Sequence, residues 1–290
     1  MKLDIKVIKN YWNENNIPQT WYSSKKKLSL EFFNEVEKER YNKYYPYLLD
    51  LGEFQNHFGE EVLEIGTGMG TDLIQFAKNG SKVYGIDLNE DQIAITKKFF
   101  EAKKLNYEDL KIGNAESLPY EDKKFDLVYS FGVIHHTADI NKAVSEIFRV
   151  LKDDGNAIIM LYAKGWKHYF KRIFIHGILK MKILRYKFNF QRIFNEVSEV
   201  NGNSPQTLIL NKKKIRELFK EFKNVQIHKT RLGEFFDYKP YQTIKFPKFI
   251  SFLLYGFGLE SIIGENYLVK VSKTKIKSSD SLFNVIFKHY

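Results

Sequence analysis

The fold is decided by one stretch, Val62-Leu63-Glu64-Ile65-Gly66-Thr67-Gly68-Met69-Gly70-Thr71-Asp72. It begins with a short apolar run, which is typical of a buried strand, and then has a glycine at every second position before a helical pattern starts. A strand, a tight glycine turn and a helix N-terminus together make a cradle for a nucleoside-bearing ligand. Glycine suits the turn because it adopts positive φ and lets a ligand approach the backbone without a Cβ in the way.

The spacing of these glycines argues against two other nucleotide-binding loops. The dinucleotide fingerprint GxGxxG would need a glycine at Thr71, whereas Gly70 comes one residue early. A phosphate loop would need Gly-Lys-Ser/Thr, which does not follow this strand. Glu64, just ahead of the first glycine, belongs to neither motif. A nicotinamide oxidoreductase is therefore the least favoured interpretation.

Strand and helix patterns alternate from this stretch to about residue 161. Apolar runs predict further strands, and helical spacing with capping residues predicts the helices between them. This alternation favours a doubly wound α/β sheet. The predicted strands are 82–86, 110–112, 125–130, 157–161, 225–228 and 267–271, and the predicted helices are 28–45, 71–79, 90–103, 140–151 and 212–222, with a turn at 153–155 and an apolar helix near 249–259.

Asp87 lies where the second predicted strand ends, 21 positions after Gly66. A carboxylate at that place can accept hydrogen bonds from both hydroxyls of a ribose. Together with the glycine turn, it indicates a nucleoside site at the carboxyl edge of the sheet.

Five segments follow one another along the chain: Glu64 with its glycine turn, Asp87, residues 114–119, residues 130–136 and residues 149–155. In this order and spacing they resemble the class I S-adenosylmethionine-dependent methyltransferases. The likeness is closest to their small-molecule branch, which includes the ubiquinone and menaquinone methyltransferases, and it covers roughly residues 60–162. It implies a Rossmann-like, seven-stranded sheet with six parallel strands and an antiparallel last strand.

The resemblance also implies roles for particular residues. The cofactor is S-adenosylmethionine, and the product is S-adenosylhomocysteine. Asn114 departs from the usual aspartate, but its amide oxygen can still accept a hydrogen bond from adenine. The implied contacts are Glu64, Gly66, Thr67, Gly68 and Gly70 with the methionine part, Asp87 with the ribose, Leu88, Asn114 and Ala115 with adenine, and Ser130 and Phe131 at the methyl group.

Methyl transfer from a sulfonium is an in-line displacement, so the protein mainly aligns the reactants and excludes water. A base is needed only when the acceptor arrives protonated, and His135 and His136 are the candidates. Tyr11, Trp12 and Tyr162 are the candidate substrate contacts. No metal is expected, because His168 and His176 are eight positions apart and no carboxylates cluster beside them.

The amino-acid composition limits the kinds of site and the classes of binding partner that this chain can have. The 290 residues include no cysteine, which excludes disulfides, zinc-thiolate sites and the cysteine nucleophile that C5-pyrimidine methylation needs. The net charge is +11, and the segment 155–195 has nine Lys and Arg with no Asp or Glu. Compositional bias and a functional basic surface explain this equally well. Because large aliphatic residues interrupt the basic ones, nucleic acid is an unlikely partner, and residues 164–192 suit an anionic membrane surface or a cap over the acceptor.

The sequence therefore predicts a methyltransferase that acts on an O or N atom of a small molecule. Two alternatives stay open: a membrane-docked lipid or quinone methyltransferase, and an RNA-binding methyltransferase that uses the basic insertion. With no signal peptide and no long apolar run, the expected location is the cytoplasm, or else the inner face of the membrane. The oligomeric state is left open.

The chain is expected to comprise five segments: a helical and aromatic lid over residues 1–59, the cofactor-binding core over 60–162, a basic amphipathic insertion over 163–205, the rest of the core sheet with a helical insertion over 206–274, and a tail over 275–290.

Overall fold

A computed structural model describes residues 3–15, 27–164, 189, 192, 195–196, 204–230, 234–239, 242–245 and 266–274. Several predictions lie outside these residues. They concern the basic helices of the insertion, His168 and His176, the apolar helix near 249–259, and the tail from residue 275.

Seven strands form one mixed sheet, in the order β3-β2-β1-β4-β5-β9-β6. The last strand in the chain, β9, runs antiparallel to both of its neighbours, and the other pairings are parallel. The prediction of a Rossmann-like sheet with one antiparallel strand is confirmed. The strands are β1 Glu61–Ile65, β2 Lys82–Asp87, β3 Asp109–Ile112, β4 Phe125–Phe131, β5 Leu151–Tyr162, β6 Asn224–Thr230 and β9 Asn266–Ser272, and a separate hairpin pairs β7 Glu234–Lys239 with β8 Gln242–Lys245.

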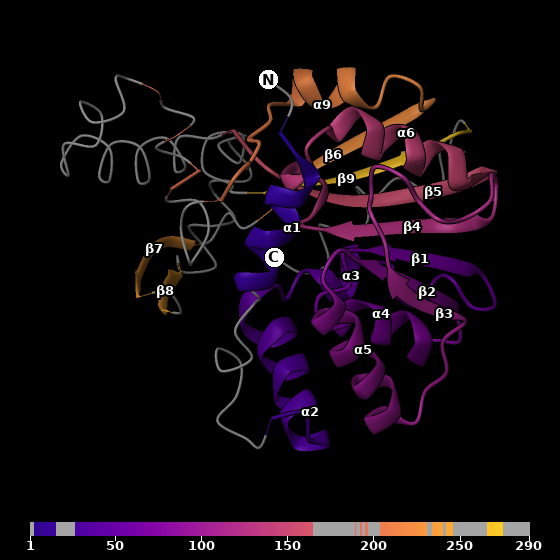
Figure 1. The fold of residues 1–290 in the computed structure, drawn as a ribbon, viewed down its shortest axis with the longest axis vertical. Coiled ribbons are helices and arrows are strands. Elements are labelled where there is room, and N and C mark those ends of the chain that lie inside the picture. Colours follow the sequence, from indigo (N-terminus) through magenta and orange to yellow (C-terminus); the bar gives the residue numbers. More distant parts are fainter. Residues whose placement is uncertain are drawn as a thin grey trace.

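Helices cover both faces of the sheet (Figure 1). One face carries α2, α4 and α5, and the other carries α6 and α9, while α1 lies beyond the arrowhead of β4. The helices are α1 Ile5–Glu14, α2 Leu30–Glu39, the π-helix η2 Arg40–Tyr44, α3 Leu48–Leu51, α4 Thr71–Lys78, α5 Glu90–Lys103, the 3-10 turn η3 Ile134–His136, α6 Ile140–Val150 and α9 Lys212–Leu218.

The core follows the two-residue period of the strands. In β1, Val62 is buried against the α2, α4 and α5 side, whereas Leu63 and Ile65 are buried on the α6 and α9 side. Strand β4 divides in the same way, with Leu127 on the first side and Val128 on the second. Both faces are therefore apolar, as a sheet covered by helices requires.

The glycine turn after β1 is shaped by close backbone contacts. Gly66 has φ +76, and a Cβ there would lie 2.3 Å from Val133 Cγ2. Gly70 has φ +78 directly before α4. Residues with a Cβ rarely adopt this left-handed conformation, so glycine is required at both positions.

Three local predictions need correction, and one element was missed. The helix expected over 28–45 ends at Glu39 and continues as a π-helix to Tyr44. The turn expected at 153–155 lies inside β5, because the ladder with β4 skips from the Phe125–Leu151 pair to the Leu127–Asn156 pair. The helix expected over 212–222 stops at Leu218. The hairpin of β7 and β8 was not predicted at all.

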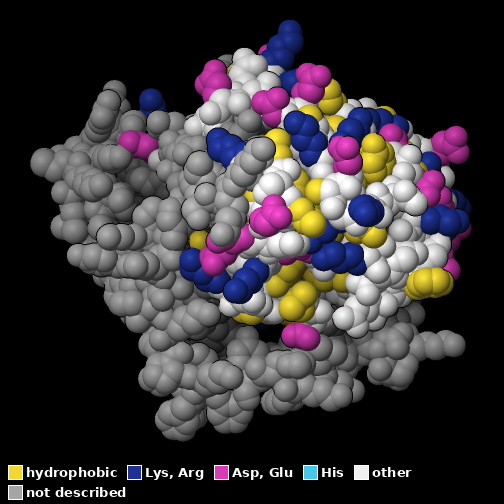
Figure 2. Space-filling view, turned by 90° about the horizontal axis from the view of Figure 1, so that it is seen from below, with side chains coloured by type: hydrophobic (Ala, Val, Ile, Leu, Met, Phe, Trp, Pro, Cys, Tyr) yellow, Lys and Arg dark blue, Asp and Glu magenta, His cyan; other side chains and the backbone are white. Residues whose placement is uncertain are grey.

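The surface of the described residues carries charges of both signs. In the face shown in Figure 2, Lys and Arg side chains alternate with Asp and Glu side chains over the described part of the chain. Among the described residues, no helix is both long and apolar enough to cross a membrane.

Candidate functional site

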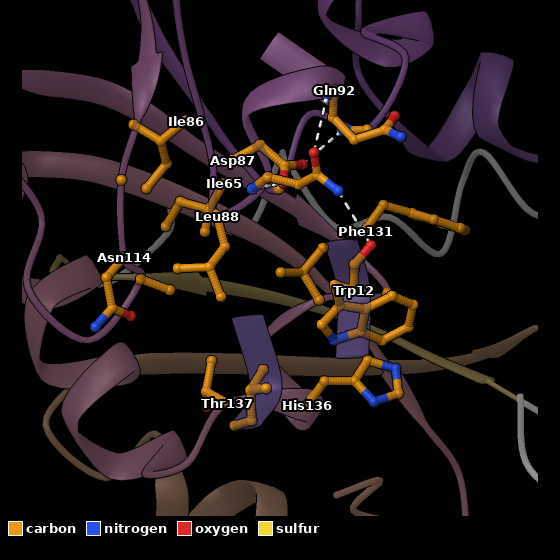
Figure 3. Close-up of a pocket in the computed structure, with 18 of the residues that line it drawn as sticks. Trp12, Ile65, Ile86, Asp87, Leu88, Gln92, Asn114, Phe131, His136 and Thr137 are labelled. Carbon is orange, nitrogen blue, oxygen red and sulfur yellow. Dashed lines mark hydrogen bonds between the residues drawn. The ribbon is translucent and has the colours of Figure 1, made fainter. Parts of the chain in front are cut away.

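A cavity of about 340 Å³ opens where the parallel strands end. Ile86, Leu88 and Asn114 lie on one side of it, and Trp12 and His136 lie on the other (Figure 3). The first and last of these residues, Trp12 and His136, are 124 positions apart in the sequence, and the topology brings all five to one edge of the sheet. Of the residues predicted for the site, the lining includes Trp12, Gly66, Gly68, Asp87, Leu88, Asn114, Ala115, Phe131, His136 and Tyr162.

Asp87 is fixed at the floor of the cavity. Its Oδ2 accepts a hydrogen bond from Gly68 N at 2.9 Å, and its Oδ1 accepts one from Asn89 N at 2.9 Å. Burial raises the pKa of Asp87 to about 6, although these backbone donors oppose the shift. The carboxylate is thus both oriented and costly to keep charged, which suits a group that binds donors of a ligand.

Helix α1 forms one wall of the cavity through Ile5, Ile8 and Trp12. The side chain of Asn89 ties this helix to the core, since its Nδ2 donates to the Trp12 carbonyl oxygen at 3.0 Å (Figure 3). The indole of Trp12 meets the imidazole of His136 edge-on, with ring centroids 5.0 Å apart. Trp12 and His136 therefore pack together on one side of the cavity, although they are 124 positions apart in the sequence.

A smaller cavity of about 70 Å³ adjoins the first on the far side of the glycine turn. Arg40 and Glu64 both line it. The guanidinium of Arg40 forms a two-pronged ion pair with Asp72, in which Nε lies 2.6 Å from Oδ1. Asp72 also accepts hydrogen bonds from the hydroxyls of Tyr41 at 2.7 Å and Tyr129 at 2.9 Å.

Glu64 is a buried acid in this smaller cavity. Its Oε2 has no hydrogen-bond partner among the described residues. Burial, and after it the neighbouring Asp72 carboxylate, raise the pKa of Glu64 well above its usual range. A cationic donor placed in the cavity would satisfy this oxygen.

Arg40 also lies against two aromatic rings. Its guanidinium carbon is 5.1 Å from the ring centroid of Tyr45 and 5.0 Å from that of Phe131. These two rings line the large cavity as well, so Arg40 stands at the junction between the two spaces.

Other predicted residues lie near the cavities without lining the larger one. Thr67 and Glu64 line the smaller cavity, and Gly70 precedes α4. Ser130 is buried, and its hydroxyl donates to the Ile65 carbonyl oxygen at 3.2 Å. His135 is also buried, with its ring centroid 4.2 Å from that of Tyr162, and Tyr11 packs edge-on against Trp12.

Sequence reasoning missed several lining residues. Arg40 is the only arginine among the first 60 residues, which was a signal that could have singled it out. Ile5, Ile8 and Trp12 have the spacing of one helix face, which could have predicted α1. Tyr45, Asn89, Gln92 and Met160 carry no comparable signal, because only the fold places them at the cavity.

No group of three or more metal-ligating side chains occurs among the residues that the structure describes.

Residues 63–159 match a family model described as a methyltransferase domain. A demethylmenaquinone methyltransferase of Symbiobacterium thermophilum is 32% identical over 126 residues, which cover 40% of this chain and 49% of that protein. Phosphoethanolamine N-methyltransferase 2 of Caenorhabditis elegans is 34% identical over 117 residues, which cover 40% of this chain and 26% of that protein. The chain thus spans half or less of the length of these two relatives.

The fold has matching solved structures. A phosphoethanolamine N-methyltransferase 2 of Haemonchus contortus, in complex with S-adenosyl-L-methionine, superimposes with a TM-score of 0.57 at 18% identity, covering 92% of this chain and 60% of that one. The match in fold agrees with the sheet order, and the family model covers the strands that carry the glycine turn and Asp87. Residues 63–159 are therefore similar to a methyltransferase domain, and the sheet that carries them has a Rossmann-like fold.

Proposed function

We propose that this protein transfers the methyl group of S-adenosylmethionine to an O or N atom of a small molecule. The observation that carries the proposal is the Asp87 carboxylate, held by Gly68 N at the glycine turn and facing a cavity of about 340 Å³. A fixed acceptor pair of this kind fits a ribose diol. When bound, the cofactor supplies an electrophilic methyl group.

The side of the cavity next to Asp87 suits an adenosine. Ile86, Leu88 and Ala115 offer apolar surfaces for the faces of a flat ring, and Asn114 offers an amide at its edge. The residues present therefore fit the nucleoside part of the cofactor.

The smaller cavity suits the amino-acid part. Glu64 supplies a buried oxygen that lacks a partner among the described residues, which fits an ammonium group. Arg40 supplies a guanidinium at the same cavity, which fits a carboxylate. In this proposal Asp72 holds Arg40 in place, so that the charges of the chain complement both charges of an amino acid.

The remaining wall of the large cavity would hold the methyl acceptor. It is mostly apolar and aromatic, with Trp12, Tyr45, Met160 and Tyr162 around His136. Such a wall excludes water from the reacting atoms and favours a small acceptor with a flat or apolar body. His136 is the described lining residue best suited to take a proton from an acceptor hydroxyl or ammonium.

Binding of S-adenosylhomocysteine is expected to weaken as the pH falls through about 6. The pKa of Asp87 is raised to about 6, so the carboxylate gains a proton below that pH and loses an acceptor for the ribose hydroxyls. Glu64, with its raised pKa, acts in the same direction, because protonation removes its attraction for an ammonium. Calorimetry should show the dissociation constant rising by up to about tenfold for each pH unit below this point. The Asp87→Asn variant should lose the part of this dependence that Asp87 causes, and a flat profile in the unmodified protein would contradict the assignment.

Replacing Trp12 by alanine is expected to weaken S-adenosylhomocysteine binding roughly fivefold, since α1 then covers less of the cavity. Val7 is the matched control, because it lies on the same helix with 48% of its surface exposed and does not line the cavity. Fluorescence or calorimetric titration of Trp12→Ala and Val7→Ala measures the difference. Equal affinities for the two variants would remove α1 from the binding site.

The proposal also extends to the chemical class of the methyl acceptor. The relatives include a demethylmenaquinone methyltransferase. The apolar wall of the cavity supports an acceptor with a flat or apolar body. Docking on an anionic membrane through residues 164–192 is a proposal from the basic sequence of that segment. The RNA alternative has the least support, because the described face in Figure 2 mixes charges of both signs.

Two measurements test the proposal as a whole. S-adenosylhomocysteine should bind the purified protein in calorimetry, and a metabolite screen with a labelled methyl donor should reveal the acceptor. Absence of binding by S-adenosylhomocysteine would contradict the proposal.

A further inference from the structure

A short segment, residues 204–210, runs beside the histidine pair, and we call it the strap. Leu208 N donates to the His135 carbonyl oxygen at 3.0 Å. The side-chain amide of Gln206 donates to the Thr137 carbonyl oxygen. The strap is thus tied to the chain on both sides of His136.

The strap also contacts the His136 ring directly. Nδ1 of His136 lies 2.9 Å from the Gln206 carbonyl oxygen. A carbonyl oxygen only accepts hydrogen bonds, so Nδ1 must carry the proton of this pair. Since a neutral imidazole has one N–H, its other nitrogen, Nε2, is then the basic one.

A second oxygen supports the same arrangement. Thr207 Oγ1 lies 3.3 Å from His136 Nδ1, and its hydroxyl donates to Ser204 Oγ at 3.0 Å. The hydroxyl of Ser204 in turn donates to the Gln206 carbonyl oxygen at 2.9 Å. Because the proton of Thr207 is directed to Ser204, its lone pairs are left to accept from Nδ1.

The residues that form these hydrogen bonds are buried. His136 is 5% exposed, Ser204 3% and Thr207 0%. Bulk water therefore does not replace these contacts, and an unsatisfied N–H at this depth would be costly. His136 is also one of the residues that line the large cavity.

We propose that the strap sets the tautomer of His136 through the Gln206 carbonyl and Thr207, and thereby makes Nε2 the proton acceptor for the incoming nucleophile. This inference rests on the proposed function. The acceptor's proton passes to Nε2, and the electron pair left on its O or N atom forms the new bond to the methyl carbon. The carbon–sulfur bond breaks with its pair staying on sulfur, and the imidazolium later releases the proton to water. Thr207 is then a positioning residue.

The strap connects His136 to the insertion. Asn195 Oδ1 accepts a hydrogen bond from Thr207 N at 3.3 Å, and Asn195 Nδ2 donates to the Pro205 carbonyl oxygen at 3.2 Å. A change in the insertion at Asn195 would therefore reach the tautomer of His136 through two hydrogen bonds.

The test is the tautomer itself, measured by ¹⁵N NMR on the full chain with labelled histidine and S-adenosylhomocysteine. The chain has seven histidines, so the His136→Gln variant assigns the resonance. We expect His136 to be protonated at Nδ1, the opposite of what free histidine prefers in water. A His136 protonated at Nε2 would overturn the inference. If S-adenosylhomocysteine did not bind, the proposed function would fail while the tautomer could still be measured.

Two variants test the strap. Thr207→Val keeps the shape of the side chain but removes one acceptor of Nδ1–H, and the ratio of the Nε2–H to the Nδ1–H form should rise about two- to tenfold. Thr207→Ser should restore the original ratio. Asn195→Ala should move the ratio in the same direction as Thr207→Val. His57 serves as the internal reference, because its Nδ1 pairs with Glu60 far from the strap. An unchanged ratio in Thr207→Val would overturn the role of Thr207.

Discussion

Replacing Asp87 by alanine is expected to weaken S-adenosylhomocysteine binding at least about a hundredfold. Each of two ribose hydroxyls would lose a hydrogen bond to a charged acceptor, and such bonds contribute about 1.5 to 3 kcal/mol apiece. The carboxylate is already held in place by Gly68 N and Asn89 N, so little ordering cost offsets the gain on binding.

Calorimetry of the variant and of the unmodified protein measures this effect. Asp91→Ala is the matched control, because Asp91 is an exposed aspartate in the first turn of α5 and does not line the cavity. Thermal unfolding should show that both variants fold. Equal affinity of Asp87→Ala and the unmodified protein would remove Asp87 from the ribose site and with it the main support for the proposed function.

Replacing Asp72 by alanine is expected to lower the free energy of unfolding by about 3 to 5 kcal/mol. Asp72 is 2% exposed, and it neutralises Arg40 while accepting from the hydroxyls of Tyr41 and Tyr129. The alanine leaves one cation and two hydroxyls without this partner in the interior, which is why the loss exceeds that of an ordinary ion pair.

Urea denaturation measures this loss. Asp153→Ala is the matched control, since Asp153 also pairs with a cation, Lys123, but its side chain is 74% exposed. That variant should unfold at the same urea concentration as the unmodified protein. Asp72→Asn should fall between the two, because it keeps an acceptor for the hydroxyls. If Asp72→Ala and Asp153→Ala were equally stable, the buried network would have no structural role.

The sheet was predictable because its signals are local. The apolar run before Gly66 and the aspartate at the end of β2 each have a spacing that one strand or turn imposes. The antiparallel β9 came from the family resemblance. These features fix the carboxyl edge of the sheet and the nucleoside side of the cavity.

The other side of the cavity depends on contacts between distant segments, which a sequence pattern does not show. Arg40 reaches the site only because α2 packs on α4 and α5, where Glu37 pairs with Lys78 and Lys103. The strap illustrates the same point, since Thr207 and His136 are 71 positions apart. The bounds of β5 were also predicted wrongly, because Gly155 lies inside this strand, where a turn was expected.

The wide turn of η2 has a consequence for how this chain tolerates insertions and deletions. Tyr45 N donates to the Arg40 carbonyl oxygen at 2.7 Å, so one residue more than an α-helical turn separates the two. Deleting a single residue from 41–44 would give a regular helix, in which each position is rotated by about 100° from the next. The Tyr45 ring would then swing away from Phe131 and Arg40. Homologues that lack this extra residue should therefore build the same corner of the site from a different side chain.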